Sequence, residues 1–550
     1  MQQFSFDFGD PVFDVAGWRI GLQVITFENT YGLDPAQVNH AVAGGNRART
    51  ISAHGFTWAG GQERSPGKAE VRVQPAGSLN GEVELSVRAR HPKKIRCTKL
   101  ILARLRPGSV IGRAWREAPL PEGGLILSYP RTLHTPLVFL RQPDGGCLYF
   151  RSTDTRVRCK RFAIYEAGGA AGGEAGAYTV ELIHEDAAHE MTNETETPAW
   201  RIGRCHDPLA VVREHCAQVE RAYAAAGLGD WNTRADVPGW MRQTSLVAAL
   251  HGMHWSGYVF NTYDQMLDAL EHICRSIEGR RVMAYLPGWE GRYYWQYGDY
   301  RPEPRLGGPA GFRRLVQGAH ALGVKVNPMF GGNCANAGSE SFEQWGAGSH
   351  LRSAGGAVFQ GNKPDWDVAR AHDTNWQAWL NPGAPGWRNR LLSQVSDLVE
   401  TYGLQDDAVF FDTHHIWEND PDHPVWEGLV RLRDGLKRRF PGLLVTGESW
   451  YDALGAVTPV CHAGVPAQWA AEFFAPHNRA WSHLSTGDPS RGSTGVHELG
   501  TRPWQPEPLL RHHLPTLTVV DGTIEHAPER VQQVIATANE YAARFLGPSS

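Results

Sequence analysis

The chain lacks any cysteine spacing that is typical of a metal site. Eight cysteines are scattered through 550 residues, and no C-x-x-C pair occurs. Thiols placed in this way are typical of reduced cysteines, which disfavours both a structural zinc centre and a disulfide framework. We therefore expect a protein with no metal site and no cofactor.

Long apolar runs and blocks of one charge are also missing. No segment reaches the roughly 18 apolar residues that a membrane span needs, and the first residues lack the basic and apolar regions of a secretory signal. Lysine and arginine number 54 against 58 aspartates and glutamates, the two signs are interspersed, and the net charge is −4. Nucleic acid and membranes are therefore disfavoured as partners. We expect a cytoplasmic protein, with homo-oligomerisation left open.

Tryptophan and glycine, by contrast, are abundant. The chain has 20 Trp, 61 Gly and 35 Pro, and its tryptophans concentrate after residue 230 in segments that resemble loops. Flat aromatic faces stack on the C–H faces of sugar rings, whereas amide, carboxylate and imidazole groups bind the hydroxyls. Carbohydrate is the partner that this composition favours, although any single tryptophan is more often a core or loop anchor.

The first part of the chain has the alternating pattern of β-strands. Short apolar/polar alternations occur, for example, at residues 70–73, 81–88 and 178–183, and Gly-, Pro- and Asp-rich turns separate them. This spacing predicts an N-terminal antiparallel β-sandwich domain over residues 1–205. A helical pattern follows, and we expect residues 206–237 to form a helical linker.

Beyond residue 238 the pattern changes to apolar runs separated by amphipathic helices, which is typical of parallel β/α units. We expect residues 238–550 to form a catalytic (β/α)8 TIM barrel, with the sixth and seventh strands unassigned between residues 453 and 505. A doubly wound sheet is the alternative, but no G-x-G-x-x-G turn follows any expected strand. The assigned strands are residues 246–250, 282–286, 324–329, 408–411, 443–446 and 516–520.

Two carboxylates stand where neighbouring expected strands end. Asp412 closes the fourth strand and Glu448 follows the fifth, and a parallel barrel has its active site at that end. Neighbouring strands lie roughly 4.8 Å apart, which suits the roughly 5–5.5 Å carboxyl separation of retaining glycosidases. We expect a retaining glycosidase with Asp412 as nucleophile and Glu448 as general acid/base. A dry environment beside Trp450 is expected to raise the pKa of Glu448.

Further residues at the expected strand ends are candidates for sugar binding. Aromatic side chains are expected to stack on a sugar ring, and polar ones to contact hydroxyls. At most one of the two adjacent histidines is expected to face the pocket, because their directions alternate. The candidates are Trp289, Glu290, Tyr294, Trp295, Asn327, His414, His415, Trp450 and Asp521.

The residues around the two carboxylates resemble a known pattern. F-F-D-x-x-H at 410–415 and G-E-S-W at 447–450 resemble the α-amylase superfamily and the related endo-α-N-acetylgalactosaminidase barrels. The resemblance implies a strand-four Asp nucleophile and a strand-five Glu acid/base. The sequence departs from the amylase pattern, because Phe410 replaces an arginine and no N-H-D motif is present; Asp521 is the one candidate for a third carboxylate. Barrels similar to α-galactosidases, with the acid on strand six, compete with this assignment.

Other functions stay open at this point. The same residues would serve a transglycosidase, and a barrel that has lost catalysis would be a carbohydrate-binding protein. A lyase or isomerase would need a lysine, histidine or metal at the strand ends, for which Lys325 is a candidate. The spacing of His251 and His254 differs from the H-x-H of barrel metallohydrolases, which disfavours a catalytic metal. The oxygen-rich stretch 418–422 lacks a defined calcium pattern.

Overall fold

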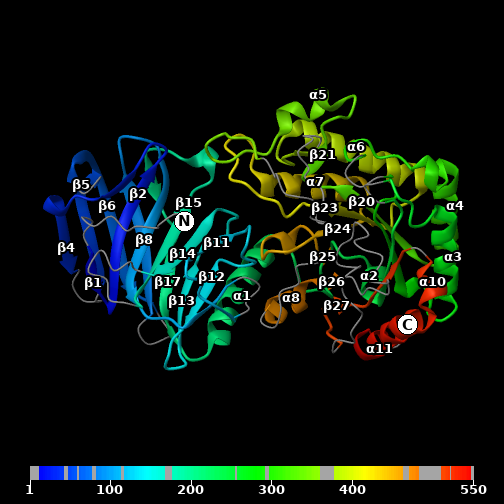
Figure 1. The fold of residues 1–550 in the computed structure, drawn as a ribbon, viewed down its shortest axis with the longest axis horizontal. Helices are drawn as coiled ribbons and strands as arrows, with labels where there is room; N and C mark the ends of the chain where they lie inside the picture. The colour runs from blue at the N-terminus through cyan, green and yellow to red at the C-terminus, as the bar shows by residue number, and fades with distance from the viewer. Residues whose placement is uncertain are drawn as a thin grey trace.

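The computed structural model combines a large β-sheet domain with a barrel of parallel strands (Figure 1). None of its described helices is long and apolar enough to span a membrane. All eight cysteines are free, and seven of them are buried. The structure describes residues 12–42, 48–58, 61–76, 82–112, 117–166, 176–253, 257–291, 296–359, 377–462, 470–481, 509–520 and 522–546.

The N-terminal domain is one continuous 17-stranded sheet. Its strands pair antiparallel, as β2 does with β8 and β14 with β15, which confirms the predicted antiparallel β region. Alternate side chains point into a shared core, as in the burial pattern of β7. The strands are β1 (Phe13–Val15), β2 (Trp18–Thr26), β3 (Thr30–Leu33), β4 (Val38–Val42), β5 (Arg49–Trp58), β6 (Glu63–Pro75), β7 (Val83–Arg90), β8 (Ile95–Leu105), β9 (Ser109–Ile111), β10 (Glu117–Pro119), β11 (Leu125–Tyr129), β12 (Leu137–Arg141), β13 (Cys147–Ser152), β14 (Lys160–Glu166), β15 (Tyr178–Glu185), β16 (Glu194–Glu196) and β17 (Trp200–Cys205).

The second domain is a nearly closed barrel of parallel strands. β18 pairs with β19 on one side and with β28 on the other, while β26 pairs with β27. Pro515 alone separates β27 from β28, and proline cannot donate the backbone hydrogen bond that would make them one strand. The strands are β18 (Leu246–Leu250), β19 (Val282–Leu286), β20 (Lys325–Gly331), β23 (Ala408–Asp412), β24 (Leu444–Glu448), β25 (Val460–His462), β26 (Arg479–Trp481), β27 (His513–Leu514) and β28 (Thr516–Val519), with a hairpin of β21 (Cys334–Asn336) and β22 (Gln377–Trp379) beside them.

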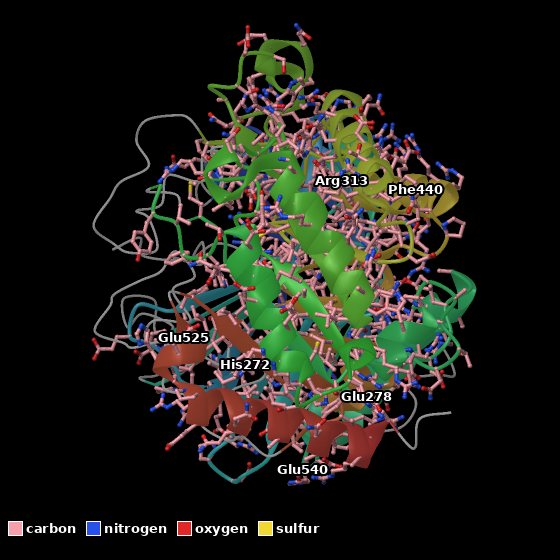
Figure 2. The ribbon with its side chains drawn as sticks, turned by 90° about the vertical axis from the view of Figure 1, so that its right-hand side faces the viewer. His272, Glu278, Arg313, Phe440, Glu525 and Glu540 are labelled. Atoms are coloured by element: carbon pink, nitrogen blue, oxygen red, sulfur yellow. The ribbon has the colours of Figure 1, made fainter. Side chains whose placement is uncertain are left out.

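Amphipathic helices cover the outside of the barrel. Figure 2 views this end of the molecule and shows the helices that carry His272, Arg313 and Glu540 lying over the strands. Sequence signals fix several of their ends: a capping box at Thr262 starts α3, and Gly323, in the left-handed conformation, ends α4. The helices are α2 (Gly239–Gln243), α3 (Tyr263–Cys274), α4 (Gly308–Leu322), α5 (Phe342–Trp345), α6 (Pro385–Tyr402), α7 (Val425–Arg439), α8 (Ala470–His477), α10 (Thr523–His526) and α11 (Pro528–Phe545).

The expected regular alternation of strand and helix fails between β24 and β25. Residues 449–459, all described, contain a 3-10 turn at Leu454–Ala456 and no α-helix. The N-terminal sheet and α1 (Pro208–Ala225) pack at this position instead (Figure 1). The sequence could not reveal this, because the apolar residues involved come from both domains. The shared cluster comprises Ile111, Leu137, Phe139, Tyr149, Val212, Val219, Tyr223, Trp450, Cys461, Phe473 and Phe474, among others.

Candidate active site

The two predicted carboxylates lie side by side at the same edge of the barrel. β23 and β24 are parallel neighbours in which Phe410 pairs with Thr446 and Phe411 with Gly447, so Asp412 and Glu448 occupy matching positions at the strand ends. The two carboxyls lie close enough that Glu448 raises the pKa of Asp412. The fold therefore brings the two groups together, as predicted, whereas their catalytic roles stay a prediction.

Each carboxylate is followed by a residue in the left-handed backbone conformation. Thr413 has φ 59° and Ser449 has φ 63°. This conformation is costly for a residue with a side chain, on the order of 1–3 kcal/mol, and persists where surrounding contacts hold it. Here the turns aim two N–H groups: Thr413 N donates to Glu448 Oε2 at 2.9 Å, and Ser449 N donates to the carbonyl of His462 at 2.7 Å. Two strained turns thus frame the carboxylate pair.

Two glycines allow the close packing around the pair. A Cβ on Gly447 would lie 2.3 Å from the His414 ring, and one on Gly331 would lie 2.3 Å from the Tyr297 ring. Both distances are far below van der Waals contact, so any larger residue would displace these rings. The glycine of the G-E-S-W motif therefore lets the turn after Asp412 pack against the strand that carries Glu448.

The contacts of the two carboxylates favour opposite protonation states. Burial and the neighbouring Glu448 charge raise the pKa of Asp412 well above its usual range, although the Tyr297 hydroxyl donates to Asp412 Oδ2 at 2.9 Å and opposes this. Burial also acts to raise the pKa of Glu448, but His415, His462 and the Thr413 N–H outweigh it and lower that pKa to about 2. His415 Nδ1 lies 3.4 Å from Glu448 Oε2. The contacts around the pair therefore shift the two pKa values in opposite directions.

The expectation of a raised pKa for Glu448 is wrong. Its carboxylate faces His415 and the Thr413 amide, which stabilise the charged form. The Trp450 ring does not shield this carboxylate from water. It packs between the domains, with its centroid 5.3 Å from that of the Phe474 ring and 5.8 Å from that of the His134 ring. Because the chain turns at Ser449, the side chains of Glu448 and Trp450 point in different directions. Residue spacing alone does not show this turn.

Three other predicted sugar-binding residues lie inside the protein. Trp289 is fully buried against Phe312 and donates from Nε1 to the Met329 carbonyl at 2.8 Å. Asn327 donates to Thr446 Oγ1 at 3.2 Å in the barrel interior. His414 is buried and lies 3.2 Å from the Thr458 hydroxyl, whereas His415 faces Glu448. Of the two adjacent histidines, one therefore reaches the carboxylate pair.

Glu290 is buried near the pair, and among the described residues neither of its carboxyl oxygens has a hydrogen-bond partner. Burial, together with the Asp412 charge, raises its pKa well above the usual range. A neutral carboxyl can donate a hydrogen bond, which an ionised one cannot. The remaining candidates, Tyr294, Trp295 and Asp521, lie outside the described residues.

The structure adds residues that the sequence did not indicate. Tyr297 binds Asp412 directly, and His462 and Trp481 end the short strands β25 and β26, which were unassigned. Tyr285 packs against Phe410 with ring centroids 4.8 Å apart and against Trp481 at 5.6 Å, so aromatic rings fill the barrel interior beneath the carboxylates. Phe410, which stands where the amylase pattern has arginine, belongs to this cluster of aromatic rings.

The oxygen-rich stretch 418–422 is occupied by protein donors. Asp420 accepts from the backbone N–H groups of Arg352, Asp422 and His423 at 2.9–3.0 Å. Asn419 donates to Glu185 and to the Asp186 carbonyl. In the part of the chain that the structure describes, no group of three or more His, Cys, Asp or Glu residues is placed to hold a metal ion.

Solved structures of glycosidases share this architecture along most of the chain, whereas no family model and no curated protein sequence matches it. An α-N-acetylgalactosaminidase, NagBb of Bifidobacterium bifidum, matches with a TM-score of 0.63 at 14% identity, covering 97% of this chain and 93% of its own. The α-galactosidase AgaA of Geobacillus stearothermophilus matches at 0.52 and 13%, covering 95% and 76%. The α-galactosidase of Lactobacillus brevis matches at 0.51 and 14%, covering 95% and 73%. At such identities the likeness establishes the fold.

Proposed function

We propose that this protein is a retaining α-glycosidase that cleaves an oligosaccharide or glycoside, with Asp412 as nucleophile and Glu448 as general acid/base. The observation that carries the proposal is the pair of carboxyls at the ends of neighbouring parallel strands, with Asp412 buried and Glu448 partly exposed. Retaining enzymes hold their carboxyls roughly 5–5.5 Å apart, whereas inverting enzymes leave roughly 6.5–9.5 Å for a water. Carboxyls at the ends of neighbouring strands, which lie roughly 4.8 Å apart, fit the shorter class.

Each carboxyl has a distinct task in this mechanism. Asp412 attacks the anomeric carbon and forms a glycosyl ester, while Glu448 gives its proton to the departing glycosidic oxygen. Water then donates a proton to Glu448 and its oxygen displaces Asp412, which restores both groups. The reacting form needs Asp412 ionised and Glu448 protonated, which is the reverse of what the contacts in the free site favour. Tyr297 assists by donating to Asp412 Oδ2, which favours the ionised nucleophile.

The sequence around the sixth strand supports Glu448 as the acid. In the competing arrangement, similar to α-galactosidases, the acid stands on strand six. Strand β25 and the residues after it, V-C-H-A-G-V-P-A-Q-W at 460–469, contain no aspartate or glutamate. The lyase alternative is disfavoured by position, because Lys325 begins β20 at the end of the barrel opposite the carboxylates.

The fold neighbours suggest which sugars to test. By their titles they are an α-N-acetylgalactosaminidase, also solved in complex with GalNAc, and α-galactosidases. We therefore propose an α-linked galactose or N-acetylgalactosamine residue as substrate. The test is a panel of α- and β-nitrophenyl glycosides, with the anomer of the first product followed by NMR. Release of the α-anomer from an α-glycoside is expected; an inverted product, or cleavage of β-glycosides alone, would contradict the proposal.

Tyr297→Phe is expected to slow turnover about 10- to 100-fold, because a hydrogen bond to a charged group contributes about 1.5–3 kcal/mol. The pKa of Asp412 should rise further, since the lost hydroxyl stabilises its ionised form. The measurement is kcat and the pH dependence of kcat/KM. Tyr300→Phe is the matched control: its hydroxyl accepts from the Gly331 N–H at 2.7 Å, so stability should fall while the pH profile stays in place. Equal pH profiles for wild type and Tyr297→Phe would show that the contact is not functional.

A further inference from the structure

The loop that follows Glu448 is bound by the N-terminal domain. Asp452, four residues after Glu448, is buried at the boundary between the domains. Its Oδ1 accepts from the Tyr129 hydroxyl of β11 at 2.5 Å, and its Oδ2 lies 3.1 Å from His215 Nε2 of α1. Oδ1 also accepts from the neighbouring Ala453 N–H at 2.8 Å, so two of the three contacts on this barrel-loop carboxylate come from groups outside the barrel.

The backbone of Asp452 is held from the same side. Its N–H donates to the carbonyl of His134 at 2.8 Å, and its carbonyl accepts from the Tyr223 hydroxyl of α1 at 2.6 Å. Four polar contacts of Asp452 thus come from the N-terminal sheet domain or from α1, and a fifth comes from Ala453 of its own loop. Buried polar groups with a full set of partners fix a single backbone position, because any alternative leaves several of them unpaired.

Apolar packing strengthens this attachment. Tyr451 lies edge-on to Tyr129 at 5.9 Å, and Trp450 packs against His134 and Phe474. In a regular barrel a helix after the fifth strand would cover this position, but here the connection has only the 3-10 turn at Leu454–Ala456. The N-terminal domain therefore supports the loop in place of a barrel helix (Figure 1).

The contacts on Asp452 help to hold the strained turn at Ser449, together with the hydrogen bond from the Ser449 N–H to the His462 carbonyl. A left-handed serine would relax toward an ordinary conformation unless the residues after it were fixed. Relaxation would rotate Glu448, whose Oε2 is 2.9 Å from the Thr413 N–H. The contacts on Asp452 fix the chain three residues beyond Ser449 and so oppose that rotation.

We infer that Asp452, bound by Tyr129, His215 and Tyr223, is a positioning residue through which the N-terminal domain holds Glu448 in place. The inference rests on the proposed function, because it assigns Glu448 the role of acid. The N-terminal sheet would then contribute to catalysis by positioning Glu448, without contacting the substrate. A general acid contributes most when the leaving group is poor, so misplacing Glu448 should harm poor leaving groups selectively.

The test compares Tyr129→Phe with Tyr165→Phe in the full-length chain. Tyr165 is also buried and donates to a carboxylate, Glu181, at 3.0 Å, but both belong to the N-terminal sheet. For Tyr129→Phe we expect amide hydrogen exchange across residues 449–456 to be about tenfold faster. We also expect kcat/KM for an alkyl glycoside to fall about tenfold more than for a nitrophenyl glycoside. Tyr165→Phe should change neither.

Each outcome has one meaning. Unchanged exchange in the loop, or equal losses on both substrates, would overturn the positioning role. If wild type cleaves no glycoside, the proposed function fails, and the exchange measurement still decides whether the N-terminal domain holds the loop. Should Tyr129→Phe fail to fold, Tyr223→Phe removes the bond to the Asp452 carbonyl and is expected to give the same two results.

Discussion

Replacing Asp412 by asparagine is expected to lower kcat on the order of 10⁴-fold or more and, at the same time, to stabilise the fold at neutral pH. The activity falls because an amide cannot form the glycosyl ester, and removal of a hydrolase nucleophile has effects of this size. Steady-state kinetics measure the loss. A variant within tenfold of wild type would place the reaction elsewhere in the protein.

The stability gain follows from the raised pKa of Asp412. A carboxyl whose folded pKa lies above its unfolded value contributes stability that is fully present below the unfolded pKa and is lost as pH rises through the folded pKa. Asparagine never ionises and keeps that contribution. Denaturant unfolding should therefore show a gap in favour of the variant that is small near pH 4 and grows toward pH 7. A gap that shrinks with rising pH would contradict the assigned direction.

Asp407→Asn is the matched control, because it makes the same change at the other end of the same strand. Asp407 accepts from the Val326 N–H at 2.7 Å and lies 3.1 Å from His320 Nε2, away from the carboxylate pair. Its replacement should cost about 1–3 kcal/mol of stability and leave kcat near wild type. One strand would then carry function at its C-terminal end and stability at its N-terminal end, as is usual in barrels.

Glu448→Gln is expected to lower kcat/KM for an alkyl glycoside by about 10²–10⁴-fold, the usual contribution of a general acid. A nitrophenyl glycoside should lose much less in its first step, since nitrophenolate departs without protonation. Pre-steady-state and steady-state rates on the two substrates measure the difference. If Glu448→Gln harms both equally while Asp412→Asn shows the leaving-group dependence, the two roles are exchanged.

The stability of Glu448→Gln should change in the opposite direction to that of Asp412→Asn. The pKa of Glu448 is lowered to about 2, so its contribution to stability is present above its ordinary pKa and is lost as pH falls through about 2. At neutral pH the glutamine variant loses that contribution, and wild type should be the more stable protein. Unfolding curves at pH 7 check this, and a stabilised glutamine variant would contradict it.

The sequence predicted the carboxylate pair because its signal is local. An apolar strand that ends in Asp412 or Glu448 is visible in a few letters, and parallel neighbours bring such ends together. Strands β25 and β26 have three residues each, too few for a pattern, so His462 and Trp481 were missed with them. Tyr297 was missed because its contact depends on how a long loop folds.

The pKa directions of the two carboxyls could not be predicted from residue spacing. It depends on the left-handed turn at Thr413, which directs an N–H toward Glu448 and brings His415 to it. The role of Trp450 was obscure for a related reason, because its neighbours Phe473 and His134 belong to distant parts of the chain. Local sequence predicts where a strand ends, whereas contacts between distant residues decide the roles of the residues that follow it.

The missing helix after β24 has a consequence for how this protein can be divided. A barrel cut free at residue 238 would expose Trp450, Phe473 and Phe474, which the sheet domain and α1 now cover. An apolar surface of that kind leads to aggregation. The two domains therefore cannot be exchanged independently, because replacing one would uncover the apolar residues of the other. The similar structures accordingly align along nearly the whole chain.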